Sequence, residues 1–173
     1  MVTNFAMRPL KVALLLVGVL VLAACRSGNT TIVLADPHPP QDVPSGSTLT
    51  LNQTIVIPAG SAALHFQDTQ LVALAAIRPN YAYCKFELDD PANTARNVEP
   101  QLFTVASVDY DERSVGSLGE DVSSTRMNLQ SGQQTTAYRM TCMLPAAIAS
   151  GRFVTVSEIN GALGSFFTLK PAY

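Results

Sequence analysis

Two cysteines lie in strand-like segments far apart in the sequence, and they constrain the fold more than any other feature. In residues 81–89 and again in residues 136–144, apolar and polar side chains alternate with the period of a β-strand. Because successive side chains of a strand point to opposite faces, each cysteine falls on the apolar face of its segment. The two segments are therefore expected to be partner strands of a mainly β (α+β) fold, an antiparallel β-sandwich or barrel-like sheet. The apolar faces hold Cys84, Phe86 and Leu88 in the first segment and Tyr138, Met140, Cys142 and Leu144 in the second.

The N-terminal residues have the composition of a secretory signal peptide. Arg8 and Lys11 precede thirteen residues, Val12 to Ala24, without a polar side chain. A transmembrane helix is the competing interpretation, but this segment would be only about 20 Å long against a hydrocarbon core of about 30 Å. The sequence therefore predicts a signal peptide over residues 1–24.

The end of this segment resembles a known motif. Leu22-Ala23-Ala24-Cys25 is similar to the lipobox of bacterial lipoproteins. The resemblance implies that Cys25 becomes the first residue of the mature chain and carries acyl groups, such as palmitate, which together give a stable membrane anchor. Arg26 stands where the family's inner-membrane retention signal has aspartate, so the resemblance implies the outer membrane. The domain is expected to face the periplasm. The alternative is an ordinary secreted protein with an incidental cysteine.

Residues 25–47 are expected to form a lipidated tether, and residues 48–173 a single domain. The tether segment contains four prolines, a composition typical of semi-rigid extended linkers. Removal of residues 1–24 leaves 173 − 24 = 149 residues, which suits one domain with a sizeable core.

With Cys25 lipidated, Cys84 and Cys142 remain. An even number of cysteines in an exported protein indicates a disulfide. A metal pair and two free thiols are the alternatives, although two thiolates without a nearby histidine make a poor zinc site. We therefore expect a disulfide that joins the two strands.

Other strands follow from alternation and turn residues. Residues 48–58 and 62–67 are expected to form a hairpin around the turn Pro58-Ala59-Gly60. The short apolar run over residues 71–77 is compatible with either a strand or a helix.

In the second half of the chain, strand patterns give way to a helix pattern near the C-terminus. Residues 102–108 are apolar on both faces and predict a central strand, whereas residues 109–132 suggest a long loop or a ragged hairpin. Thr155-Val156-Ser157-Glu158 has the spacing of a helix capping box. It predicts a helix over residues 156–163, followed by a last strand over residues 165–169.

Several segments together resemble a family of uncharacterised proteobacterial envelope lipoproteins. The likeness covers much of residues 47–169 and supports the disulfide and the C-terminal helix. It implies no activity and no catalytic residues. The segments that carry it are Cys84-Lys-Phe-Glu-Leu, Val98-Glu-Pro-Gln-Leu-Phe-Thr-Val, Met140-Thr-Cys142 and Ser157-Glu-Ile-Asn-Gly-Ala-Leu-Gly164.

Few residues suggest catalysis. Of the two histidines, His65 is expected at the surface, on the opposite face of its strand from Leu64 and Phe66. No nucleophile elbow, zinc-protease or phosphate-loop motif occurs, and the sequence places no base beside a serine. The mature chain carries 9 − 13 = −4 charges once Arg8 and Lys11 are removed, which argues against nucleic-acid binding.

One acidic segment partly matches a calcium loop. Asp109, Asp111 and Glu120 fall at positions 1, 3 and 12 of that template, but Arg113 and Ser114 occupy positions 5 and 6. These three acids are therefore only weak metal candidates, and no metal or other cofactor is expected.

The tyrosines allow a further alternative. Tyr81, Tyr83 and Tyr138 could surround the disulfide as an aromatic platform for a ligand, or they could simply pack at the edge of the core.

These observations predict an outer-membrane-anchored lipoprotein with a non-enzymatic structural or protein-interaction role in the cell envelope, with another envelope protein as its partner. The alternative is a ligand- or ion-binding module that uses the acidic loop over residues 109–121. A hydrolase with a site assembled from distant residues is the third possibility.

Overall fold

The computed structural model describes residues 43–132 and 138–172. Within them the chain forms an eight-stranded antiparallel sheet with strand order β10-β1-β7-β8-β9-β5-β3-β4 and a separate two-stranded sheet, β2-β6. The strands are β1 Thr48–Leu51, β2 Ile55–Ile57, β3 Ala63–Gln67, β4 Gln70–Val72, β5 Tyr83–Leu88, β6 Arg96–Val98, β7 Gln101–Val115, β8 Asp121–Ser131, β9 Tyr138–Pro145 and β10 Phe167–Lys170. The helices are the 3₁₀-helix η1 Leu74–Ala76 and the α-helices α1 Ala146–Ala149 and α2 Val156–Leu163.

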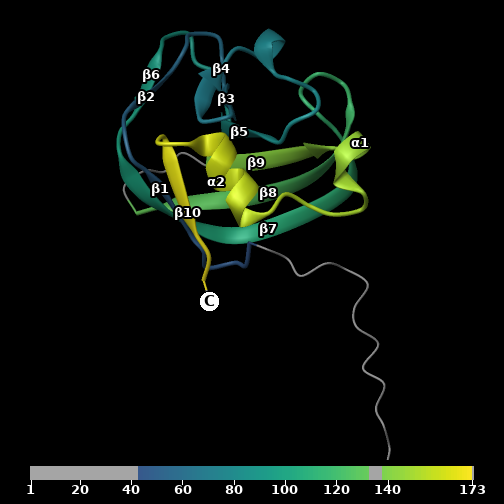
Figure 1. Ribbon diagram of the computed structural model, residues 1–173. Helices are drawn as coiled ribbons and strands as arrows, with labels where there is room; N and C mark the ends of the chain where they lie inside the picture. The colour runs from purple at the N-terminus through teal and green to yellow at the C-terminus, as the bar shows by residue number, and fades with distance from the viewer. Residues whose placement is uncertain (1–42, 133–137, 173) are drawn as a thin grey trace, which may run out of the picture. The chain divides into compact units, whose positions relative to one another are not determined.

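The large sheet curls into a half-barrel, and α2 lies across its concave side (Figure 1). The core fills the space between them, because most of the buried apolar residues of the strands point to this side. Aromatic rings occupy its centre: Phe86 lies within 6.0 Å, centroid to centroid, of Phe103, Tyr138 and Phe167. Fold class and α2 are therefore as predicted.

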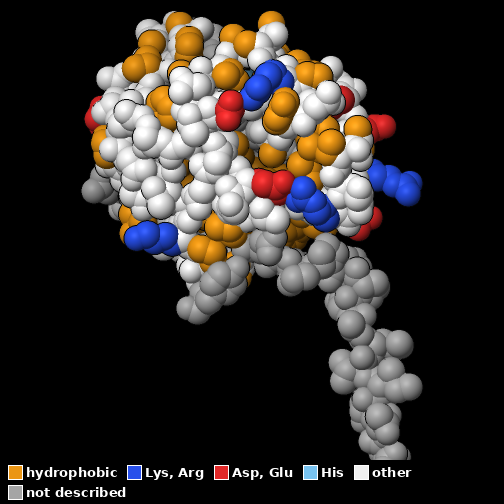
Figure 2. All heavy atoms as spheres, in the orientation of Figure 1, with side chains coloured by type: hydrophobic (Ala, Val, Ile, Leu, Met, Phe, Trp, Pro, Cys, Tyr) orange, Lys and Arg blue, Asp and Glu red, His pale blue; other side chains and the backbone are white. Residues whose placement is uncertain are grey.

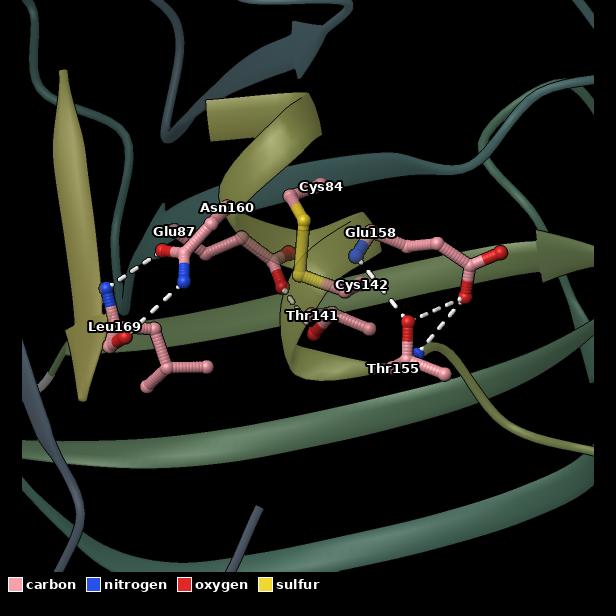
Figure 3. The surroundings of a disulfide bond; sticks show 8 residues. All are labelled: Cys84, Glu87, Thr141, Cys142, Thr155, Glu158, Asn160 and Leu169. Atoms are coloured by element: carbon pink, nitrogen blue, oxygen red, sulfur yellow. Dashed lines mark hydrogen bonds between the residues drawn. A yellow bond between two sulfur atoms is a disulfide. The ribbon is translucent and has the colours of Figure 1, made fainter. Parts of the chain in front are cut away.

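Cys84 and Cys142 form the predicted disulfide, and the strand register explains it. The two residues are direct cross-strand partners in the antiparallel pair β5–β9, with Cα atoms 4.0 Å apart. Both are fully buried on the concave side (Figure 3). The disulfide therefore joins two adjacent strands inside the core.

The C-terminal helix begins and ends as its sequence predicts. The Thr155 hydroxyl accepts a hydrogen bond from the Glu158 backbone N–H, and the Glu158 carboxylate accepts one from the Thr155 N–H, which completes the capping box (Figure 3). At the other end, Asn160 binds β10: its side chain donates to the Leu169 carbonyl and accepts from the Leu169 N–H. These bonds hold α2 against the last strand.

The predicted hairpin over residues 48–67 is wrong. β2 pairs with β6 in the small sheet, whereas β3 pairs with β5 and β4 in the large one. Pro58-Ala59-Gly60 does turn the chain, but it leads from one sheet to the other. Residues 48–58 are also two strands rather than one, since β1 pairs with β10 and β7 in the large sheet and β2 lies in the small one. Local alternation could not identify the partners, because pairing depends on residues distant in sequence.

The segment over residues 109–132 is a hairpin rather than a loop. β7 and β8 pair along most of their lengths, with irregularities between Val105 and Ser107 and between Asp111 and Ser114. β7 lies inside the sheet, but only one of its faces is buried, since Leu102 is 56% exposed. The predicted central position of residues 102–108 is therefore confirmed, although one face of the strand is exposed.

Residues 71–77 contain both elements that the sequence allowed, β4 followed by η1. Residues 43–47, expected in the tether, contact the domain instead. Val43 is buried and bonds through its backbone to the Tyr110 hydroxyl, and Gly46 and Ser47 bond to Val105. The predicted signal peptide, Cys25 and the remainder of the tether lie outside the described residues. No helix of the described part is long and apolar enough to cross a membrane.

Candidate functional site

The face of the large sheet opposite the core carries a row of charged and polar side chains. Strand register places Lys85 of β5 opposite Thr141 of β9, and Thr141 opposite Arg126 of β8. Two residues farther along the strands, Glu87 lies opposite Arg139. Because residues i and i+2 of a strand share a face, these five side chains form one continuous floor.

The tip of the β7–β8 hairpin borders this floor and completes a groove of about 160 Å³, which we call the outer-face groove. Tyr83 holds the tip in place. Its hydroxyl donates a 2.7 Å hydrogen bond to Glu120 Oε1 and accepts one of 2.7 Å from the Ser117 N–H. The groove is lined by Lys85, Glu87, Ser114, Val115, Gly116, Ser117, Ser124, Arg126, Arg139, Thr141 and Met143.

The Tyr83 ring lies in a small apolar cluster on this outer side of the sheet, with Ile77, Val122 and Met143. Its burial, together with the hydrogen bond to the Glu120 carboxylate, raises the pKa of Tyr83 to about 12. The phenol is therefore protonated at neutral pH and acts as a structural donor.

The charges of the groove are unevenly paired. Lys85 Nζ lies 2.8 Å from Glu87 Oε1, whereas neither Arg126 nor Arg139 forms an ion pair with any described residue. The Nε atom of Arg139 is buried and has no hydrogen-bond acceptor in the described part of the chain. Buried donors in proteins are normally satisfied, so this one needs an explanation.

His65 and Ser117 meet at the end of the groove, which the sequence did not predict. His65 Nε2 lies 3.2 Å from Ser117 Oγ, so a serine does have an imidazole beside it. Burial, and secondly the charge of Lys85, lower the pKa of His65, which keeps the ring neutral. Among the described residues no group bonds to the other ring nitrogen, so the pair has no orienting carboxylate of the kind found in catalytic triads.

The three weak calcium candidates have separate partners. Asp109 accepts a hydrogen bond from Asn128, Asp111 accepts one from the Arg113 N–H, and Glu120 binds Tyr83 and the Leu118 N–H. Within residues 43–132 and 138–172, no group of three or more histidine, cysteine, aspartate or glutamate side chains could hold a metal ion. The calcium template therefore matches the sequence without a matching geometry.

The three tyrosines do not form a platform around the disulfide. Tyr81 is half exposed and lies under the guanidinium of Arg78, Tyr83 is buried on the outer side of the sheet, and Tyr138 stacks on Phe86 in the core. The alternative, packing of the tyrosines in the protein interior, holds for Tyr83 and Tyr138, and Tyr83 and Cys84 point to opposite faces of β5.

A second, apolar groove lies beside β4, the strand at one end of the large sheet. It has a volume of about 450 Å³, and two of the leucines that line it, Leu71 and Leu74, are each 46% exposed. Figure 2 shows hydrophobic side chains at the surface of the end of the molecule where Figure 1 places β3 and β4. We call this the edge groove; it is lined by Pro58, Ser61, Ala63, Leu64, His65, Leu71, Val72, Ala73 and Leu74.

Because comparisons with known proteins give no match, any inference about function rests on the fold and on these two grooves. No family model, no curated protein and no solved structure matches this chain significantly. Sequence reasoning placed Arg139 and Thr141 on the polar face of their strand, as observed, but did not connect them with Lys85 or Arg126. Only the strand order brings these residues together.

Proposed function

We propose that this protein is an outer-membrane-anchored lipoprotein with a non-enzymatic, protein-interaction role in the cell envelope. The lipobox-like sequence ending at Cys25 supports the anchor, and the disulfide is compatible with an oxidising compartment. The observation that carries the interaction role is the edge groove beside β4.

β4 is a three-residue strand at one end of the large sheet. Natural proteins usually guard such edges by keeping them very short, or with charged residues, proline or a covering element. β4 consists of Gln70, Leu71 and Val72 and has no charged side chain, whereas the strand at the other end of the sheet, β10, ends in Lys170. An apolar edge next to an apolar groove suits the addition of an extended peptide.

The partner segment is expected to be extended and apolar. Its backbone would pair with β4, and its alternate side chains would enter the groove between Leu71 and Leu74. The charged residues that flank β4 and η1 in the sequence, Asp68 and Arg78, already form an ion pair with a distance of 2.9 Å, so they supply little attraction for a charged partner. Hydrophobic burial then provides most of the affinity.

Site-specific photocrosslinking in intact cells tests this proposal. A photoreactive residue at Leu74 should crosslink to one envelope protein, and Leu71→Asp should abolish the product. The matched control is Leu102, which is also exposed but lies on β7, away from the edge groove. Equal crosslinking from both positions, no product from Leu74, or a product that contains only two copies of this chain would refute the proposal.

The anchor has its own test. Intact mass of the protein from isolated membranes should correspond to a chain that starts at Cys25 and carries acyl groups, and reduction should add two hydrogen atoms for the disulfide. An unacylated chain would refute the anchor and would leave the proposed interaction at the edge groove unaffected.

A further inference from the structure

We infer that the outer-face groove binds a phosphate group through Arg126 and Arg139. This goes beyond the proposed interaction role, because the groove lies on a different part of the sheet from β4 and its chemistry is cationic. The inference depends on which charges in the groove are already paired.

Arg139 has a carboxylate opposite it that does not pair with it. Glu87 is its cross-strand partner, but the Glu87 carboxylate binds Lys85 Nζ at 2.8 Å and accepts a hydrogen bond of 3.5 Å from Thr141 Oγ1. Opposite charges directly across an antiparallel pair normally stabilise a sheet by interacting. Here the Glu87 carboxylate forms its ion pair with Lys85 on the same strand instead, so the Arg139 guanidinium is available to a ligand.

Arg126 repeats this arrangement one strand away. Its cross-strand partner on β7 is Asp109, whose carboxylate accepts a hydrogen bond of 3.3 Å from Asn128 and lies beyond ion-pair distance of the guanidinium. Arg126 is exposed at the groove and so is open to a ligand. Two arginines on neighbouring strands thus share one groove, and neither has an ion-pair partner among residues 43–132 and 138–172.

The charge and size of the groove suit a phosphate. Its lining has three cations, Lys85, Arg126 and Arg139, and one carboxylate, Glu87, so its net charge is 3 − 1 = +2, whereas the whole chain carries −2. A dianion neutralises this local excess. Arginine presents several N–H donors in a fork that matches phosphate oxygens.

The groove admits only a small group. Its volume of about 160 Å³ lies below the roughly 300–1,000 Å³ of sites that enclose a drug-sized ligand. Hydroxyl groups of Ser117 and Ser124 also line it and can donate to remaining oxygens. A phosphate monoester, free or at the end of a larger molecule, has the required size and acceptors.

Calorimetric titration of the full chain in neutral detergent with inorganic phosphate tests the site. Binding should be saturable in the unmodified protein, and the Kd should rise about 10-fold or more in Arg126→Gln and again in the double variant with Arg139→Gln, as expected when a charged hydrogen bond is lost. Arg113→Gln is the matched control, since Arg113 is exposed on β7 but does not line the groove. The thermal midpoint of each variant, measured without phosphate, separates loss of binding from loss of folding.

A second titration with glycerol 3-phosphate identifies the source of the phosphate. A Kd similar to that for inorganic phosphate supports a soluble phosphate ligand, whereas binding about 10-fold tighter supports a phospholipid headgroup. Absence of binding for both compounds overturns the inference. Binding that Arg126→Gln and the double variant leave unchanged, while the proteins remain folded, also overturns it.

Discussion

The backbone of Thr69 lies against Gly164, so closely that a Cβ atom at position 164 would be 2.6 Å from the Thr69 Cα. Thr69 is at the tip of the β3–β4 hairpin, and its N–H donates to the carbonyls of Gly161 and Ala162 at 3.1 and 3.2 Å. The hairpin thus satisfies carbonyl groups that the end of a helix leaves without partners. Asp68 and Thr69 both have positive φ values, 52° and 66°, a conformation that glycine or asparagine adopts more easily. The contact with α2 offsets the cost of this turn.

Replacement of Gly164 by alanine should therefore lower the free energy of unfolding by about 1–3 kcal/mol, because the new methyl group meets backbone that cannot move aside. The φ of 57° at Gly164 adds to the cost. Urea denaturation followed by circular dichroism measures the change. Gly161→Ala is the matched control: a Cβ there meets nothing within 4 Å, so alanine should stabilise the helix by about 0.5–1 kcal/mol. Equal effects at the two positions would contradict the contact.

Loss of the disulfide should destabilise the domain by about 2–4 kcal/mol, because Cys84 and Cys142 are 58 residues apart and their bond restricts the unfolded chain. The measurement compares urea midpoints of the oxidised protein, the reduced protein and the Cys84→Ala/Cys142→Ala variant. The slope of the transition should increase in the variant, since its unfolded state is more expanded. A midpoint that reduction does not change would show that strand pairing alone holds β5 and β9.

Tyr83→Phe should lower the free energy of unfolding by about 1–3 kcal/mol, because it leaves Glu120 Oε1 and the Ser117 N–H without their hydrogen-bond partner. The alkaline titration provides a second readout. The pKa of Tyr83 in the folded state, about 12, lies above the ordinary value of 10.0, so the protonated phenol stabilises the fold below pH 10 and this contribution disappears as the pH rises toward 12. Ultraviolet absorbance should show one tyrosine that ionises last, and Tyr83→Phe should remove it. Tyr81→Phe is the control, since Tyr81 is half exposed.

The start of α2 should make the stability of the domain depend on acid pH. The ion pair with Arg152, together with the Thr155 hydrogen bonds, lowers the pKa of Glu158 from 4.5 to about 2. Its ionised form therefore stabilises the fold above pH 4.5, and this contribution is lost as the pH falls toward 2. Thr155→Ala should lower stability by about 1 kcal/mol at neutral pH. Glu158→Gln should lower it at pH 7 and have little effect at pH 2; an equal loss at both pH values would contradict the role of the charge.

Local patterns in the sequence were enough to predict several features of the structure. The alternation around Cys84 and Cys142 predicts two strands with buried cysteines, and the capping box predicts α2, because such patterns depend on neighbours a few residues apart. The β-rich class and the disulfide followed from these signals. The export signal and Cys25 are sequence predictions as well, and they await the mass measurement.

Tertiary structure alone decided which strands pair and which side chains meet. Residues 55–57 and 62–67 look like a hairpin locally, but their partners lie elsewhere, since pairing is chosen by the packing of the whole sheet. Lys85, Arg126 and Arg139 come from three different strands and share a groove only through the order β8-β9-β5. Their chemistry is visible in the sequence, and so is the spacing of two residues that brings Lys85 and Glu87 together on β5. The proximity of the three cations, by contrast, arises from long-range register that no local pattern encodes.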